Sequence, residues 1–120
     1  MSRAPLLIDN AADGEGWTEL GSTEDLFGQR ACRALKVCGH HVGLFRVEGE
    51  ILAVDNICTH GNAQLTDGEV EGGQVECPLH AGVFDLRTGK AMTAPLNRDV
   101  RAHAVRSEDG KLFLQLKLVA

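Results

Sequence analysis

The sequence lacks the features that mark several large classes of protein. It has no apolar run near the roughly 18 residues of a membrane-spanning helix, and the apolar patch at residues 6–8 is too short for a secretory signal. Basic residues are the minority: 12 Lys and Arg against 17 Asp and Glu give a net charge of −5. Nucleic acid and anionic membranes would be repelled by this charge. We therefore expect a cytoplasmic protein that binds neither.

Aromatic residues and proline are also scarce, whereas glycine is abundant. The 120 residues include no Tyr, one Trp, four Phe and three Pro, but fourteen Gly. The length suffices for one domain, and 43% apolar residues exclude a disordered chain. Short alternating stretches between glycines predict many short strands and tight turns. We expect one all-β domain over residues 1–120, of nine or ten strands, with residues 1–16 as an N-terminal arm.

Glycine-containing turns divide the predicted strands. Gly72 and Gly73 predict a two-residue hairpin turn, and Asp109-Gly110 predicts another. After the second turn, Leu112, Leu114, Leu116 and Leu118 alternate strictly, which places them on one face of a strand. Strands are expected at residues 17–20, 32–38, 41–47, 51–57, 68–71, 74–76, 83–86, 91–92, 100–107 and 111–119, with a short helical turn at 22–26.

Two short segments carry the chemistry of the chain. Cys58 and His60 form one pair, Cys77 and His80 form the other, and sixteen residues separate the two pairs. Thiolate and imidazole bind soft and borderline metals, and a single zinc ion would accept all four. The Gly-Gly hairpin between the pairs can bring both loops side by side. Each loop then supplies one sulfur and one nitrogen, which equally suits a binuclear iron centre with two Cys on one iron and two His on the other.

A longer stretch resembles a known family. The segment from Cys58-Thr-His-Gly to Cys77-Pro-Leu-His-Ala-Gly-Val-Phe-Asp-Leu-Arg-Thr-Gly-Lys-Ala91 is similar to the cluster-binding region of Rieske-type ferredoxins. It resembles in particular the ferredoxin components of bacterial aromatic-ring-hydroxylating dioxygenase systems. The similarity runs from about Trp17 to Leu118, and residues 93–95 match the family's proline loop.

The resemblance implies a fold and a cofactor. The fold would be an antiparallel β-sandwich or barrel of short strands, with a smaller cluster-binding subdomain at about residues 57–96. The cofactor would be one Rieske [2Fe–2S] cluster. By resemblance, Cys58 and Cys77 would hold the buried iron, while His60 and His80 would hold the outer one.

The resemblance also implies a function. The protein would be a one-electron carrier between an NAD(P)H-dependent flavoprotein ferredoxin reductase and a terminal oxygenase component, and not itself an enzyme. We assign it no catalytic residue. Alternatives are a ferredoxin of a monooxygenase, a Rieske-like subunit of another reductase, an iron–sulfur sensor, or a structural Cys2His2 zinc module.

The sequence differs from the respiratory-chain Rieske proteins at the positions that tune the cluster. Those proteins carry an extra Cys in each ligand loop, whereas here Leu79 stands in the second loop and no Cys lies between Gly61 and Glu76. They also carry a Ser and a Tyr that donate hydrogen bonds to cluster sulfur, where this chain has Gly82 and Phe84. Without these donors the reduced cluster is less stabilised. We predict a reduction potential near the low end of the Rieske range, about −150 mV.

The remaining candidates have simpler interpretations. Cys32 and Cys38 are predicted to be small buried side chains rather than spare ligands, and His103 to be structural or exposed. A small apolar collar is expected around the two ligand histidines, made of four residues: Leu65, Leu79, Ala81 and Pro95.

Overall fold

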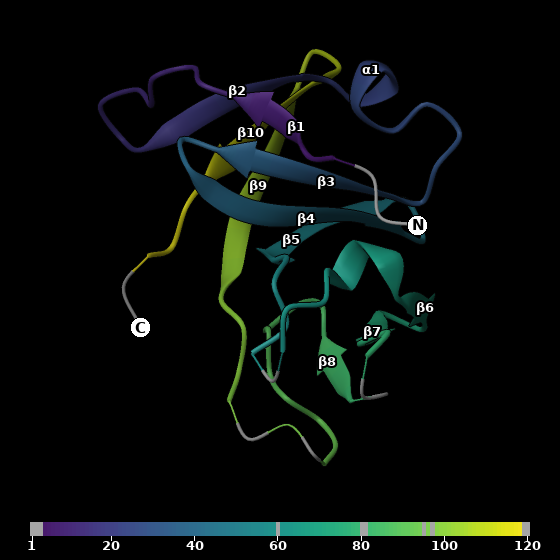
Figure 1. Ribbon diagram of the computed structural model, residues 1–120. Helices are drawn as coiled ribbons and strands as arrows, with labels where there is room; N and C mark the ends of the chain where they lie inside the picture. The colour runs from purple at the N-terminus through teal and green to yellow at the C-terminus, as the bar shows by residue number, and fades with distance from the viewer. Residues whose placement is uncertain (1–3, 60, 80–81, 95, 97, 119–120) are drawn as a thin grey trace.

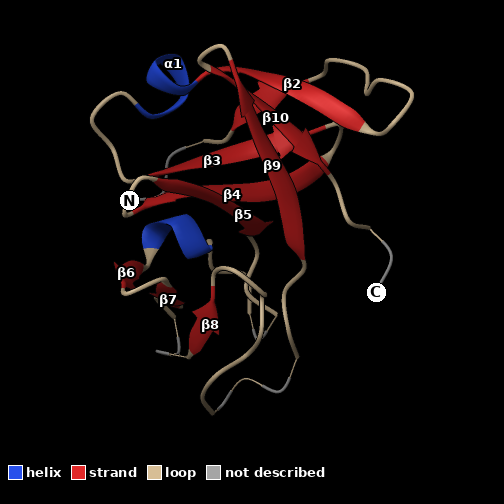
Figure 2. Ribbon diagram, turned by 180° about the vertical axis from the view of Figure 1, so that it is seen from behind, coloured by secondary structure: helices blue, strands red, loops and turns tan. Residues whose placement is uncertain are grey.

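The computed structural model describes residues 4–59, 61–79, 82–94, 96 and 98–118. In that part of the chain ten strands form two sheets, and helix is limited to short pieces (Figures 1 and 2). A seven-stranded sheet has the order β1-β3-β4-β5-β9-β10-β2, and a three-stranded sheet has the order β6-β7-β8. The predicted all-β class is confirmed.

The elements follow one another along the chain with short connections. Their bounds are β1 Leu6–Ile8, β2 Trp17–Ser22, α1 Thr23–Phe27, β3 Cys32–Val37, β4 His40–Val47, β5 Glu50–Asp55, the 3₁₀ helix η1 Leu65–Asp67, β6 Glu69–Glu71, β7 Gln74–Glu76, β8 Val83–Asp85, β9 Ala102–Glu108 and β10 Lys111–Gln115.

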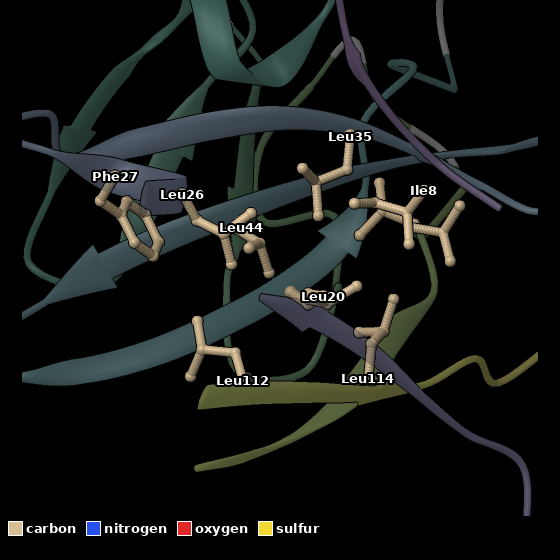
Figure 3. Close-up of a cluster of buried hydrophobic side chains, with 11 residues drawn as sticks. Ile8, Leu20, Leu26, Phe27, Leu35, Leu44, Leu112 and Leu114 are labelled. Carbon is tan, nitrogen blue, oxygen red and sulfur yellow. The ribbon is translucent and has the colours of Figure 1, made fainter. Parts of the chain in front are cut away.

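The first core lies within the seven-stranded sheet and is made of hydrocarbon side chains. Strands β2, β3, β4 and β10 and helix α1 all contribute to it, and their side chains point toward one another in Figure 3. Leu112 and Leu114 belong to this core, as the alternating pattern predicts. We call it the sheet core; its buried members are Ile8, Leu20, Leu26, Phe27, Leu35, Val37, Val42, Leu44, Ala53, Leu112 and Leu114.

Strand β4 is buried on both faces because a second core lies behind it. Val42 and Leu44 face the sheet core, whereas Phe45 and Val47 face the second core. A strand covered on both sides is a continuous apolar run rather than an alternating one, which explains the Val-Gly-Leu-Phe sequence at residues 42–45.

The second core joins the sheet to residues 56–100, which we call the insert. The chain leaves the sheet after β5 and returns at β9, and η1 and strands β6 to β8 lie within the insert (Figure 1). The predicted hairpin between β6 and β7 is confirmed, with φ of 57° at Gly72 and 81° at Gly73. We call this second cluster the insert core; its buried members are Phe45, Val47, Val54, Cys58, Leu65, Val75, Cys77, Phe84, Leu86, Leu96 and Val100.

Three predicted boundaries were wrong. Residues 6–8, placed in an arm, form β1 and pair in parallel with β3; three residues are too few for a periodic signal. Strand β10 ends at Gln115, so Leu118 lies outside it and is 42% exposed. The expected strand at 91–92 is reduced to one bridge between Ala91 and Phe84.

None of the helices in the described ranges is long and apolar enough to cross a membrane.

Candidate metal centre

The first predicted ligand loop begins where β5 ends. Ile57 bridges Gln64, and the backbone N–H of Cys58 donates to the carbonyl of Ala63 at 2.9 Å. The chain therefore turns back on itself at residues 58–63. The thiol of Cys58 is buried in the insert core.

Asn56 fastens the base of this loop. Its buried side-chain amide donates to Thr66 Oγ1 at 3.0 Å and to Gln64 Oε1 at 3.1 Å, while its Oδ1 accepts from the Thr66 N–H at 2.9 Å. Gly43 on β4 leaves room for this network, because a Cβ there would lie 2.8 Å from Asn56 Oδ1. Asn56 and Gly43 were missed by the sequence analysis, since no spacing pattern relates them.

The second predicted ligand loop connects β7 and β8. Glu76 pairs with Val83 in the hairpin, and the N–H of Cys77 donates to the carbonyl of Gly82 at 2.7 Å. Cys77 is fully buried in the insert core, alongside Cys58. The two cysteines therefore enter one apolar cluster from two loops.

The described residues between 92 and 98 contact both loops. Thr59, in the first loop, donates from its hydroxyl to the carbonyl of Arg98 at 2.8 Å. Next to the second loop, the N–H of Val83 donates to Thr93 Oγ1 at 2.9 Å. Leu96 covers Gly82 so closely that a Cβ at that glycine would lie 2.4 Å from Leu96 Cγ. Sequence reasoning matched residues 93–95 to the family's proline loop by resemblance but gave none of these contacts.

The donor set fits an iron–sulfur cluster as far as the described residues extend. The two predicted ligands Cys58 and Cys77 are the two cysteines that are buried, whereas Cys32 is half-buried and Cys38 is exposed. Buried thiols in one cluster, without a disulfide, suit a thiophilic metal. The predicted ligands His60 and His80 lie outside the described residues. Accordingly, the described side chains include no group of three or more His, Cys, Asp or Glu able to hold a metal ion.

The other two cysteines are less buried: Cys32 packs against the insert core from outside, and Cys38 is exposed. Cys32 is half-buried and its thiol donates to the carbonyl of Thr66 at 3.2 Å. Burial and the nearby carboxylate of Asp67 raise the pKa of this thiol. Cys38 is exposed, contrary to prediction, because it begins the tight turn between β3 and β4 with φ of 48°.

The predicted apolar collar needs one correction. Leu65 is fully buried in the insert core, because η1 turns it inward beneath β4. Leu79 is 57% exposed, as expected for a collar residue, and Met92 is a further exposed apolar side chain at 45%. Ala81 and Pro95 lie outside the described residues.

A buried histidine and an ion pair lie where the insert joins the sheet. His103 is structural, as one of its two interpretations predicted: its Nε2 lies 2.9 Å from Asp55 Oδ1. Arg101 donates from Nε to Asp55 Oδ2 at 3.0 Å. Burial alone would raise the pKa of Asp55, but the hydrogen bonds from His103 and Arg101 outweigh it and lower the pKa to about 2.

Comparison with known proteins gives the same assignment as the resemblance. The family model of the Rieske [2Fe-2S] domain matches residues 16–104. The chain is 40% identical over 103 residues to the ferredoxin component of the naphthalene 1,2-dioxygenase/salicylate 5-hydroxylase systems of Ralstonia sp.. That match covers 86% of this chain and 98% of the relative. The chain is also 49% identical over 73 residues to the ferredoxin component of the 2,4-dinitrotoluene dioxygenase system of Burkholderia sp. (strain RASC). This second match covers 61% of this chain and 70% of the relative.

Solved structures share the fold. The ferredoxin of carbazole 1,9a-dioxygenase from Nocardioides aromaticivorans IC177 superposes with a TM-score of 0.75 at 31% identity, over 83% of this chain and 99% of that one. A chain in the complex of reduced oxygenase and oxidized ferredoxin in carbazole 1,9a-dioxygenase superposes with a TM-score of 0.76 at 26% identity, over 88% of this chain and all of that one. The fold, the two buried thiols and the match over most of the chain agree. The protein therefore belongs to the Rieske [2Fe–2S] domain family and carries a [2Fe–2S] cluster.

Proposed function

We propose that this protein carries single electrons from an NAD(P)H-dependent flavoprotein reductase to the terminal oxygenase of an aromatic-ring-hydroxylating dioxygenase system, in the cytoplasm. The observation that supports this most directly is the burial of Cys58 and Cys77 in one apolar cluster, each at the start of a predicted ligand loop. The relatives named above are ferredoxin components of such systems. Like them, the protein is an electron carrier rather than the catalytic component.

We assign the cluster to the four residues predicted as ligands. Cys58 and Cys77 would hold one iron, and His60 and His80 the other, within a cluster-binding subdomain at about residues 57–96. The bound cluster takes up and releases one electron at a time. The protein's part is to keep water from the thiols with the apolar side chains of the insert core and to hold the two loops together through Thr59 and Thr93.

The partners would dock at the loops. Leu79, in the second loop, and Met92, in the segment that contacts it, are exposed apolar side chains. A few such contacts suit a weak complex that exchanges quickly, as redox partners do, with an interface below about 1,200 Å².

The test is a spectrum with a metal assay on anaerobically purified protein. We expect visible absorption of a red-brown protein, two irons per chain, little zinc, and a reduced-state EPR signal of low average g. Cys77→Ser should abolish the signal, whereas Cys38→Ser should leave it unchanged, because Cys38 is exposed and outside the insert core. A colourless protein with one tightly bound zinc would make it a structural module instead.

The partner assignment needs a separate assay. Reductase and oxygenase of a naphthalene dioxygenase system supply both partners, and the protein should support NAD(P)H-dependent product formation that stops when it is omitted. A protein with the correct spectrum but no turnover with this or other dioxygenase pairs would favour an iron–sulfur sensor.

A further inference from the structure

The chain crosses between the sheet and the insert twice, and the two crossings lie side by side. It leaves through Asp55, the last residue of β5, and returns through Arg101, just before β9. The N–H of Asp55 donates to the carbonyl of Arg101 at 2.9 Å. We propose that Asp55 is a positioning residue for the cluster: its carboxylate locks both crossings together and so holds the first ligand loop, which begins three residues later at Cys58. The proposal rests on the cluster assignment given above.

Both carboxylate oxygens of Asp55 are occupied by donors from the returning strand. Oδ2 accepts from the backbone N–H of Arg101 at 2.9 Å and from its Nε at 3.0 Å. Oδ1 lies 2.9 Å from His103 Nε2. The same arginine donates from a terminal nitrogen to the carbonyl of Leu118 at 3.0 Å. We call these contacts of Asp55, Arg101 and His103 the junction.

The surroundings of His103 decide where its proton lies. The backbone N–H of Lys117 donates to His103 Nδ1 at 2.9 Å. Because a backbone N–H is only a donor, Nδ1 must carry the lone pair, and the proton must lie on Nε2. His103 therefore donates to Asp55, and its ring is held from both sides while its side chain is only 1% exposed. Asp55 thus faces three N–H donors and no acceptor.

An amide cannot satisfy this arrangement. In Asp55→Asn one carboxylate oxygen becomes an NH₂ group, which would point a donor at either His103 or Arg101. The tautomer of His103 cannot adjust, because Lys117 requires a lone pair on Nδ1. The variant keeps the size of the side chain but loses the hydrogen bond to His103 or those to Arg101, and it places two donors against each other.

The chain offers a matched control. Glu50, at the start of β5, pairs with Arg87 of the insert at 2.8 Å, and both side chains are about half exposed. Glu50→Gln is therefore the same carboxylate-to-amide change in another arginine pair between sheet and insert, away from the crossings. A second control is Leu112→Ala, which weakens the sheet core and leaves the junction intact.

The experiment measures release of the cluster from the reconstituted protein in the presence of an iron chelator, by bleaching of its visible absorption. We expect Asp55→Asn to accelerate release about tenfold and Glu50→Gln less than twofold. The reduced-state EPR lines should broaden in Asp55→Asn alone, because only there does the ligand loop lose its fixed placing. Equal acceleration in Asp55→Asn and Leu112→Ala, with unchanged EPR lines, would reduce Asp55 to a general contributor to stability and overturn the proposal.

Hydrogen exchange provides a readout that does not depend on iron. The amides of Arg101 and Lys117 donate within the junction, and we expect both to exchange at least tenfold faster in Asp55→Asn and at the wild-type rate in Glu50→Gln. Unchanged exchange in Asp55→Asn would overturn the proposal. A protein that contains no iron but shows this exchange pattern would refute the proposed function. It would still support the role of Asp55 in holding the two crossings together.

Discussion

The sheet core and the insert core are built on different principles. The sheet core is filled by hydrocarbon side chains from strands of up to eight residues, which pair along most of their lengths. The insert core includes two thiols, and its own strands have three residues each. Strands this short give a sheet little independent stability. We therefore expect the sheet to hold its shape by packing alone, whereas the insert should depend on its turns, on the sheet behind it and on its metal.

Removal of the iron should separate the behaviour of the two cores most strongly. We expect chelation of the reduced protein to release the insert while the sheet stays folded, because metal binding supplies folding free energy to small metal sites. Amide exchange should rise by orders of magnitude at Val75 and Phe84. The fluorescence of Trp17, which lies on β2 against the guanidinium of Arg106 at 4.6 Å, should stay native. Loss of the native Trp17 signal on chelation would show that the two regions fold as one unit.

Two equally buried leucines allow the stability of the two cores to be compared directly. Leu44 belongs to the sheet core and Leu65 to the insert core, and both are fully buried. Leu44→Ala should lower the free energy of unfolding reported by Trp17 by about 3 kcal/mol. Leu65→Ala should instead speed loss of the cluster and shift the Trp17 urea midpoint much less. The same loss of Trp17-detected stability in both variants would contradict the distinction.

Acid should weaken the junction between the two regions. The pKa of Asp55 is lowered from 3.8 to about 2 in the folded protein, so its carboxylate stabilises the fold above pH 3.8 and loses this effect as the pH falls toward 2. The contribution at neutral pH is about 2 kcal/mol, and about half of it should be gone at pH 3.

The measurement compares wild type with Asp55→Asn in urea, following Trp17 at several pH values. The difference in unfolding free energy should shrink from pH 6 to pH 3. A difference that does not change with pH would mean that the charge of Asp55 does not matter for stability.

The smallest effect concerns the reduction potential. By the resemblance described above, Gly82 and Phe84 correspond to positions where respiratory-chain Rieske proteins have hydrogen-bond donors. Phe84→Tyr, and Gly82→Ser combined with Leu96→Ala, should each raise the potential on the order of tens of millivolts, within a family range of about −150 to +300 mV. The second variant needs its partner change because Leu96 fills the space beside Gly82. Direct electrochemistry on each variant checks this, with Leu96→Ala alone as the control, and an unchanged potential in both would contradict the role of the missing donors.

Much of the fold was predictable because short-range patterns specify it. Alternation at Leu112 and Leu114 and the glycines at 72 and 73 predicted a strand and a turn that the structure contains. Strand β1 escaped prediction, because three apolar residues have no period and their pairing with β3 involves residues almost thirty positions away. The buried position of Leu65 was missed for the same reason, since η1 has no signal in so short a stretch.

The chemistry of this protein can be predicted from its sequence alone. Two Cys and two His stand at a spacing that suits a [2Fe–2S] cluster, with the Gly-Gly turn between them. The contacts that hold the first ligand loop in place become visible only in the tertiary structure. Asp55 meets Arg101 and His103 across 46 and 48 residues of chain, and Asn56 fills the space left by Gly43. Ligand spacing is local and is written in the order of the residues, whereas these contacts exist only once the insert has folded back onto the sheet.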